Sequence, residues 1–274
     1  MDATATVITH IIDVLVLPFG RTHHTLQLVW LSVLTGVGMA FVFKITSSQK
    51  TIKRTKDRLK ARILEMRLYQ DDPVLIFRGL GGALKNNLVY LGTIFVPFVI
   101  MIVPVAIVFT QLDQRYSRSY LPPGSTARLS VQLRDVFDPF TTPVELHIEG
   151  GAAPIGKPVR DLVMRETDWK VLVDAGGTPQ VTVYAKGASY SFPLVAESSY
   201  RMIGNERRDK ALFEPILHPG LPPIPLDSPF QRVRVEYPPA SHWLLGWHVH
   251  WIVIFLVYSM IAAFAMKVLA GIEI

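Results

Sequence analysis

The side chains best able to do redox or metal chemistry in this sequence are its histidines. Five of them fall near one predicted membrane interface, at His23, His24, His242, His248 and His250. Histidine is a common ligand of metals and haem, so a redox subunit is one hypothesis. His248 and His250 are only two residues apart, a spacing that points them in different directions on a helix. We therefore favour histidines at a membrane interface, with no metal site and no cofactor.

The sequence contains no recognised arrangement of catalytic side chains. It lacks a Ser-His-Asp pattern, an H-E-x-x-H motif and a nucleophile elbow. Cysteine is absent, which excludes thiolate chemistry, disulfides and cysteine metal sites. Asp135 and Asp138 lie in the segment Arg-Asp-Val-Phe-Asp-Pro, which is typical of a turn. We expect that the protein is not an enzyme.

A glycine-rich stretch at Gly79, Gly81 and Gly82 has two interpretations. One is a phosphate-binding loop, but the stretch lacks the Walker pattern and a preceding strand. The other is a hinge, because glycine is conformationally permissive and weakens a helix. We favour the hinge, placed between a cytoplasmic hairpin and a membrane span.

Positive charge is concentrated between Lys44 and Lys85, where eleven Lys and Arg accompany four Asp and Glu. Apolar residues recur every seven positions here, at Ile45, Ile52, Leu59 and Met66. This spacing predicts a helix over 49–70 with a single apolar stripe. Asp72 followed by Pro73 is a helix-start signal and predicts a second amphipathic helix. Residues 46–87 are therefore predicted to form a basic helical hairpin with some coiled-coil character.

The basic hairpin has two candidate partners. Its candidate contact residues are Lys53, Arg54, Arg58 and Arg62. Anionic lipid headgroups are the favoured partner of a basic segment beside a membrane, and capture of a protein is the alternative. Nucleic acid is not expected, because no recognition motif or interleaved aromatic residues accompany the charge.

Three apolar segments are long enough to cross a bilayer. A stretch of about 20 residues, at about 1.5 Å each, matches the hydrocarbon core of about 30 Å. The predicted spans are 26–45, 88–112 and 243–269, the last within a segment 241–270. Trp243, Trp247 and Trp251 stand at the start of the third span, where interfacial aromatic anchors are expected.

Small residues and prolines mark possible packing features of the spans. Gly36 and Ala40 give the first span a small-x-x-x-small face suited to close helix packing. Pro97 and Pro104 lie seven residues apart in the second span, on nearly the same face. They predict kinks, either packed against neighbouring helices or forming one wall of a groove.

The orientation of the spans follows from the distribution of charge. Basic loops stay in the cytoplasm, so 46–87 is predicted to lie inside. The segment 113–240 carries fifteen basic and fifteen acidic residues and is predicted to lie outside. This places the chain in the inner membrane with its N-terminus outside and its C-terminus inside. Residues 1–25 are expected to form an amphipathic segment at the outer surface.

The segment 113–240 has the pattern of a small β domain. Short alternating or apolar runs separated by Gly, Pro and Asp predict strands at 127–134, 144–149, 169–174, 180–185, 190–195 and 232–237. Their number and spacing suggest an immunoglobulin-like sandwich. A helix is predicted at 206–217, followed by an extended proline-rich stretch at 218–229.

The order of these parts resembles the superfamily of YidC/Oxa-type membrane insertases. The likeness is closest to the three-span branch, the archaeal YidC-like proteins and the third subunit of the endoplasmic-reticulum membrane complex. It is carried by Ile12-Asp-Val-Leu-Val-Leu-Pro18, by Phe43-Lys44 with Gln49 soon after, and by Val96-Pro-Phe-Val-Ile-Met-Ile-Val-Pro104. It covers roughly residues 1–112 and the last 30. The chain departs from YidC in carrying its β domain between the second and third spans.

The resemblance implies a polar groove within the membrane, which in this superfamily often holds a basic residue. The first span has no charged residue over 26–43. The nearest candidates are at the cytoplasmic ends of the spans, and would line the mouth of such a groove: Lys44, Lys85, Asn86 and Asn87.

Two functions remain open from the sequence. The first is an insertase-like chaperone that assists insertion or assembly of membrane proteins, which would be its substrates. The second is a non-catalytic structural subunit of a larger membrane complex, docking through its β domain.

Overall fold

The computed structural model divides the chain into two compact units. One comprises Met1–Leu28 and Phe109–Trp251, and the other comprises Val29–Val108 and Ile252–Ile274. The structure describes residues 3–16, 18, 24–68, 73–197, 202–209, 222–225, 227–244 and 246–272.

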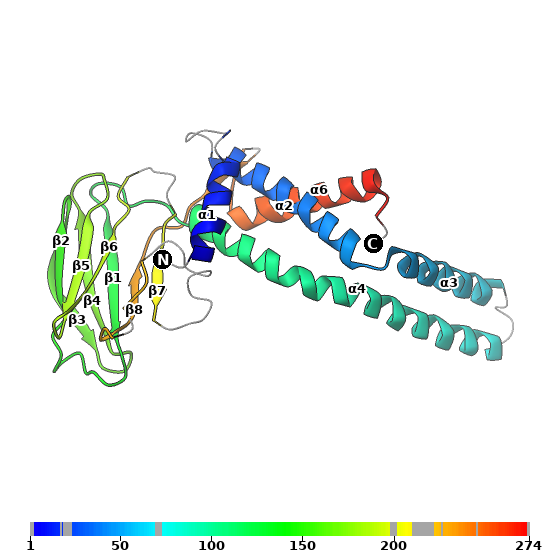
Figure 1. Cartoon of the computed structure of the whole chain (residues 1–274), viewed down its shortest axis with the longest axis horizontal. Coiled ribbons are helices and arrows are strands. Elements are labelled where there is room, and N and C mark those ends of the chain that lie inside the picture. The colour runs from blue at the N-terminus through cyan, green and yellow to red at the C-terminus, as the bar shows by residue number, and fades with distance from the viewer. Residues whose placement is uncertain are drawn as a thin grey trace. The chain divides into compact units, whose positions relative to one another are not determined.

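Three of the helices in the described part of the chain are long and apolar enough to cross a membrane (Figure 1). They are α2 (His24–Thr46), the segment Leu80–Tyr116 of α4 (Pro73–Tyr116), and α6 (Trp251–Ala270). The described residues also form α1 (Ala3–Val16) and α3 (Gln49–Leu68). The three predicted spans are therefore confirmed as apolar helices, and they are compatible with a multi-pass membrane protein.

Helix α4 is longer than predicted, with 44 residues in one continuous element. The predicted interruption of the helix at Gly79, Gly81 and Gly82 is wrong, because the helix runs through all three positions, whereas their role as a hinge stays a prediction. It also continues through Pro97 and Pro104. A backbone in apolar surroundings has few hydrogen-bond partners other than its own helix, so helical structure persists across residues that break helices in water.

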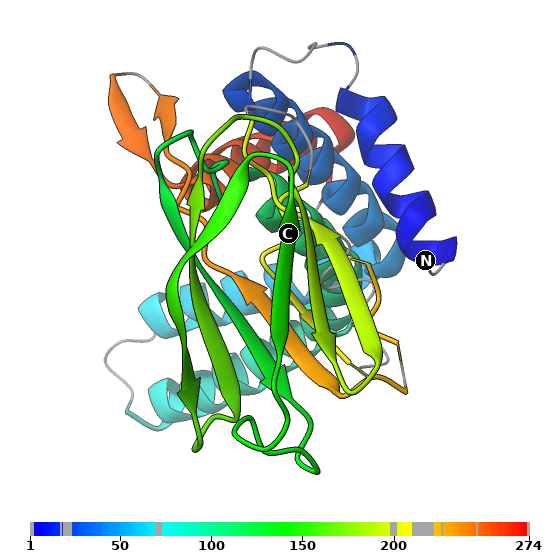
Figure 2. The same cartoon turned by 90° about the vertical axis from the view of Figure 1, so that its left-hand side faces the viewer.

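The β domain contains two antiparallel sheets (Figure 2). The larger has the order β3-β4-β1-β8-β7 and the smaller has the order β2-β5-β6. The strands of the larger sheet are β1 (Thr126–Leu133), β3 (Ala152–Asp161), β4 (Glu166–Val173), β7 (Glu206–Arg208) and β8 (Phe230–Val235). Those of the smaller sheet are β2 (Glu145–Glu149), β5 (Gln180–Ala185) and β6 (Ala188–Pro193).

Both sheets contribute to a single hydrophobic core, because alternate side chains of their strands point inward. In β1 the buried residues are Leu129, Val131 and Leu133, each two positions from the next. From the smaller sheet, Val183 and Phe192 join the same cluster. The core therefore comes from sequence-distant strands.

All six predicted strands are present within a few residues of their expected bounds. β3 was not predicted, because Pro154, Gly156 and Pro158 interrupt its pattern. In the structure its pairing with β4 shifts register between Ile155 and Val159. The predicted helix at 206–217 is wrong over Glu206–Arg208, which form strand β7 against β8. Its positions 210–217 lie outside the described residues.

The third predicted span begins later than expected. Two short strands, β9 (His242–Leu244) and β10 (Trp247–Val249), pair as a hairpin before α6 starts at Trp251. Gly246 lies in the turn with φ of +91°, a conformation that suits glycine and few other residues. Trp243 and Trp247 therefore belong to the hairpin that precedes the helix.

Candidate functional site

The base of the basic hairpin is fixed to the spans by a small apolar cluster. Ile52 of α3 is fully buried against Ala40 and Phe43 of α2 and against Ile272. The turn into α3 is tight, since the Ser47 amide donates to the Phe43 carbonyl at 2.9 Å. The predicted apolar stripe thus anchors the hairpin at Ile52.

Most of the predicted cations of the hairpin face solvent. Lys53, Arg54 and Arg58 are exposed along α3. Lys56, which was not singled out from the sequence, lies with its Nζ 6.0 Å from the centre of the Tyr90 ring. The side chain of Arg62 lies outside the described residues. This surface has the charge and accessibility needed to contact anionic headgroups or a partner.

Lys44 has a structural contact that sequence reasoning did not foresee. Its Nζ donates to the carbonyl of Ala270 at 3.0 Å. The last carbonyls of a helix have no intrahelical donor and carry partial negative charge, so a lysine there satisfies and stabilises them. Lys44 therefore ties the end of α6 to the end of α2.

The other predicted groove-mouth residues do not form one patch on α4. Lys85 and Asn87 are exposed and Asn86 is half-buried. They occupy three consecutive positions of a helix, so their side chains point in three different directions. Further along α4, Pro97 is buried and Pro104 is half-buried.

A group of polar side chains that was not predicted surrounds the end of α4. We call it the junction cluster and define it as Thr9, Asp13, Gln27, Gln111, Gln114, Arg115, Tyr116 and His242. Arg115 makes an ion pair with Asp13 of α1 at 2.6 Å, and its side chain is only 8% exposed. It also donates to the Thr9 carbonyl at 3.4 Å, and the Gln111 amide lies 3.5 Å from the Thr9 hydroxyl. These contacts attach α1 to the end of α4.

Tyr116 connects the junction cluster to α2 and to the β9–β10 hairpin. Its hydroxyl donates to Gln27 Oε1 at 3.4 Å, and its carbonyl lies 2.8 Å from His242 Nε2. Burial lowers the pKa of His242, the hydrogen bond to Tyr116 opposes this, and the nearby His250 lowers the pKa further. A neutral His242 is therefore favoured at the junction.

The junction cluster holds buried polar atoms without a partner among the described residues. They are Gln111 Oε1, Gln114 Oε1 and Arg115 Nε. Buried polar groups in proteins are usually hydrogen-bonded, so such atoms call for a functional or structural explanation. Together they provide two free acceptors and one free donor at the end of an apolar helix.

A sequence signal for the junction cluster existed at the end of the second span. Gln111, Gln114 and Arg115 have the spacing i, i+3 and i+4, which places them on one face of a helix. The predicted span ended at residue 112, so Gln114 and Arg115 were assigned to the following domain and separated from Gln111. The helix in fact continues to Tyr116.

The predicted tryptophan anchors differ in their environments. Trp243 and Trp247 are 64% and 76% exposed on the β9–β10 hairpin, as anchors would be. Trp251 differs from these two, because it is fully buried, with its ring centre 4.8 Å from that of Phe109. It packs in the core at the start of α6.

No group of three or more metal-ligating side chains occurs among the residues that the structure describes. His242 and His248 face different sides of the hairpin, since His248 pairs with Trp243 and His242 with Val249. His23 lies outside the described residues. Asp138 accepts a hydrogen bond from the Phe140 amide at 2.8 Å, and Asp135 pairs with Arg165 at 2.6 Å.

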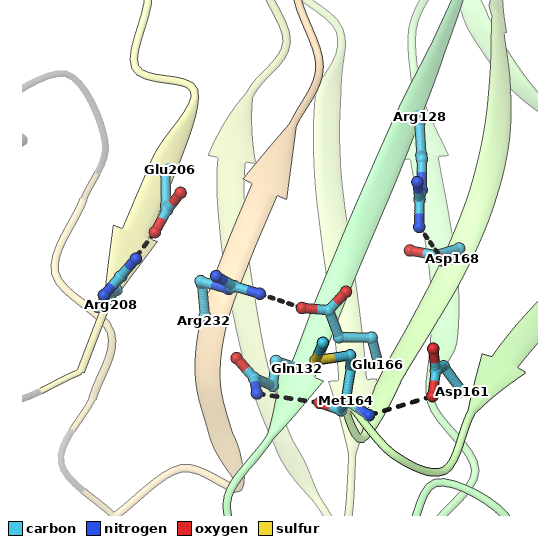
Figure 3. A network of polar contacts seen from close by, with 9 residues as sticks. All are labelled: Arg128, Gln132, Asp161, Met164, Glu166, Asp168, Glu206, Arg208 and Arg232. Carbon is cyan, nitrogen blue, oxygen red and sulfur yellow. Dashed lines mark hydrogen bonds and ion pairs between the residues drawn. The ribbon is translucent and has the colours of Figure 1, made fainter.

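The outer face of the larger sheet carries a ladder of ion pairs (Figure 3). Arg128 of β1 pairs with Asp168 of β4 at 2.6 Å, and this contact raises the pKa of Arg128. The other pairs are Arg232 with Glu166, and Arg208 with Glu206. The first pair joins neighbouring strands, whereas the second reaches from β8 to β4 across β1 and the third lies within β7. Opposite charges placed across neighbouring strands stabilise a sheet.

Comparisons with known protein families, with curated proteins and with solved structures found no match to this chain.

Proposed function

We propose that this chain is an insertase-like chaperone that assists the insertion or assembly of other membrane proteins. In this proposal the three spans lie in the cytoplasmic membrane, with the N-terminus and the β domain outside and the basic hairpin and C-terminus inside. The β domain is of immunoglobulin-like type, a proposal supported by its two antiparallel sheets and single core.

The observation that carries the proposal is the junction cluster at the end of the Leu80–Tyr116 span. Insertion needs no covalent catalysis; it needs a lower cost for moving polar groups through hydrocarbon, where an unpaired charge or amide is expensive. Gln111 Oε1, Gln114 Oε1 and Arg115 Nε have no partner among the described residues and are buried. In this proposal they become available to the backbone of a passing segment when the elements packed on them, α1 among them, move aside. Arg115 gives this cluster a charged group, which the first span lacks over 26–43.

Helix α4 supports the proposal with a second feature. Only 6% of its most apolar window is buried, against 33% for α2 and 17% for α6. Large apolar side chains such as Leu88, Phe95 and Val103 are exposed along it. In this proposal a transmembrane segment of a substrate packs on this surface as it moves from the headgroup region into the hydrocarbon core.

The same exposed surface of α4 favours a second candidate, a fixed structural subunit of a larger complex. In that case another membrane protein would permanently cover Leu88, Phe95 and Val103. The two candidates differ in the number of proteins that contact α4 and the hairpin, not in the chemistry of the surface.

Site-specific photocrosslinking in cells separates the candidates. Probes replace Lys53, Arg62 and Asn87, with a fourth probe at Gln180 of the β domain as a control position. An insertase is expected to crosslink to many newly made membrane proteins from the first three positions. One fixed set of partners at constant stoichiometry would overturn the insertase proposal and support the structural subunit.

The junction cluster can be tested directly by removing its free acceptors. The double variant Gln111→Leu/Gln114→Leu is expected to reduce insertion of a single-span substrate into proteoliposomes severalfold, because the polar lining is lost. Ser259→Ala, a similar polar-to-apolar change on α6, is the matched control. Unchanged insertion by the double variant would show that the cluster has only a structural role.

A further inference from the structure

One end of the β domain exposes a group of large apolar side chains. We call it the apolar tip and define it as Val136, Phe140, Leu162, Val163 and Met164. Val136 and Val163 are 86% and 87% exposed, and the other three are each more than half exposed. Single exposed apolar residues are ordinary, but a contiguous group of them marks a binding surface.

The two loops that form the apolar tip are held side by side. The Leu133 amide donates to the Arg165 carbonyl at 3.0 Å, and Gln132 Nε2 donates to the Met164 carbonyl at 2.9 Å (Figure 3). Arg160 lies 5.8 Å from the centre of the Phe140 ring. The residues of the tip thus belong to one surface. Val136 and Phe140 precede β2 in the sequence, whereas Leu162, Val163 and Met164 follow β3.

Acidic side chains hold the loops in a shape that keeps the apolar residues outward. Asp161 Oδ1 accepts from the amides of Val163 and Met164, at 2.8 and 3.1 Å. Asp138 Oδ1 accepts from the Phe140 amide at 2.8 Å. Such turns fix the backbone before any partner arrives, so the tip loses little conformational entropy on binding.

The charge around the apolar tip is positive on balance, because three aspartates stand against five cations, an excess of two: Asp135, Asp138 and Asp161 against Lys157, Arg160, Arg165, Lys170 and Lys186. Asp135 is paired with Arg165, and Asp138 and Asp161 accept hydrogen bonds from their own turns. The cations near the tip make no ion pair within the described part of the chain: Lys157, Arg160, Lys170 and Lys186. Lys186 lies instead 4.4 Å from the centre of the Phe137 ring.

A hollow of about 550 Å³ lies along β3, and one of its lining residues, Val159, is three positions before the tip residue Leu162. Ile155 and Val159 form its apolar part, and its cations are Arg128, Lys157 and Lys170. Asp168 and Glu236 also line it, but Asp168 already pairs with Arg128. The hollow therefore offers two lysine ammonium groups to an anion, beside an apolar wall.

We propose that the apolar tip docks on the bilayer, in the leaflet on the β domain's own side. Apolar side chains flanked by free cations match a surface of acyl chains below anionic headgroups. Val136, Leu162 and Val163 enter the boundary between headgroups and acyl chains, and Lys157 and Lys170 contact headgroup phosphates. The helices that flank the domain tether it to one bilayer, so a weak affinity is enough.

The absence of cysteine from the sequence makes a direct test possible. Val163→Cys carries an environment-sensitive fluorophore as the single label in the full chain, reconstituted in nanodiscs of phosphatidylglycerol and phosphatidylcholine. Lipids with spin labels on their acyl chains are expected to quench the probe at position 163 strongly. Gln180→Cys, on the exposed face of β5, is the control and is expected to show no quenching.

Charge and lipid source are tested in the same system. Lys157→Gln/Lys170→Gln is expected to reduce the quenching at position 163, as are nanodiscs of phosphatidylcholine alone. Equal quenching at 163 and 180, or none at either, would overturn the proposal. Quenching that appears only when vesicles are added would show that the tip binds a second membrane. A protein crosslink from position 163 in cells would show that the tip binds a protein. Either result would also overturn the proposal.

Discussion

Arg115 and Asp13 form an ion pair whose two members differ in their access to solvent. Arg115 keeps 8% of its side chain exposed, whereas Asp13 keeps 52%. Removing one member of a buried pair is costly chiefly because the other is left buried without compensation. The cost therefore depends on which residue is replaced.

Asp13→Ala is expected to destabilise the folded chain by about 2 kcal/mol more than Arg115→Met does. Asp13→Ala leaves a buried guanidinium without its carboxylate. Arg115→Met removes the buried charge, and Asp13 can be hydrated. Thermal unfolding in detergent measures the difference, and the double variant should recover most of the loss. Equal effects of the two single variants would contradict the argument.

His242 makes the stability of the junction depend on pH. Burial lowers its pKa below the ordinary value of 6.5. A base with a lowered pKa in the folded state binds protons more readily when unfolded, so stability is lost as pH falls below 6.5 towards the folded pKa. The His250 charge adds to this effect, and the hydrogen bond to Tyr116 opposes it.

His242→Gln is expected to reduce the loss of thermal stability between neutral and mildly acidic pH. Glutamine retains a donor for the Tyr116 carbonyl but takes up no proton. His147→Gln, at an exposed position of β2, is the matched control for the loss of a histidine outside the junction. A pH profile of His242→Gln that matches the unaltered chain would exclude His242 as the acid-sensitive group.

At the scale of elements, the packing of α2 against α6 depends on one glycine. A Cβ atom on Gly36 would lie 2.2 Å from the Ser259 backbone carbonyl oxygen, so the two helices approach backbone to backbone there. A Cβ on Gly38, two residues later, would meet nothing within 4 Å. The predicted small-residue face of the first span is thus a packing face at Gly36.

Gly36→Ala is expected to destabilise the helix pair by about 1–3 kcal/mol, because the backbone of α6 must shift to admit the methyl group. Gly38→Ala is the matched control on the same helix and should be neutral or slightly stabilising, since alanine favours helices. Thermal unfolding in detergent checks both. A similar loss in the two variants would show that helix propensity, and not packing, sets the result.

The elements that could be predicted are those whose pattern is uniform. Apolar runs identified three span helices, and strict alternation identified strands such as β1 and β5, because burial alone decides those patterns. β3 and the β9–β10 hairpin were missed, since Pro154, Pro158 and Gly246 are read as breaks although an edge strand or turn accommodates them. Gly79, Gly81 and Gly82 were likewise interpreted as a break in a helix, because glycine is unfavourable within helices.

The junction cluster was missed because its partners are far apart in the sequence. Asp13 and Arg115 are separated by about a hundred positions, and no local pattern joins them. Their meeting depends on where α1 folds back, which only the three-dimensional structure supplies. The hairpin cations, by contrast, were predicted from a local count of charges and are exposed where the structure describes them.

At the scale of the whole molecule, the distribution of charge predicts the orientation of the chain in its membrane. The segment from Lys44 to Lys85 carries eleven basic and four acidic residues, an excess of seven positive charges. The segment 113–240 carries fifteen of each. Short basic loops resist translocation, whereas long balanced segments cross readily, so opposite sides of the membrane are expected for the two.

Single cysteines report this orientation, because the chain has none of its own. A membrane-impermeant maleimide added to intact spheroplasts is expected to label Gln180→Cys in β5 but not Lys60→Cys in α3. After permeabilisation both should react, which controls for the accessibility of each site. Labelling of Lys60→Cys alone before permeabilisation would contradict this orientation. It would show that the basic hairpin lies outside and that the β domain faces the cytoplasm.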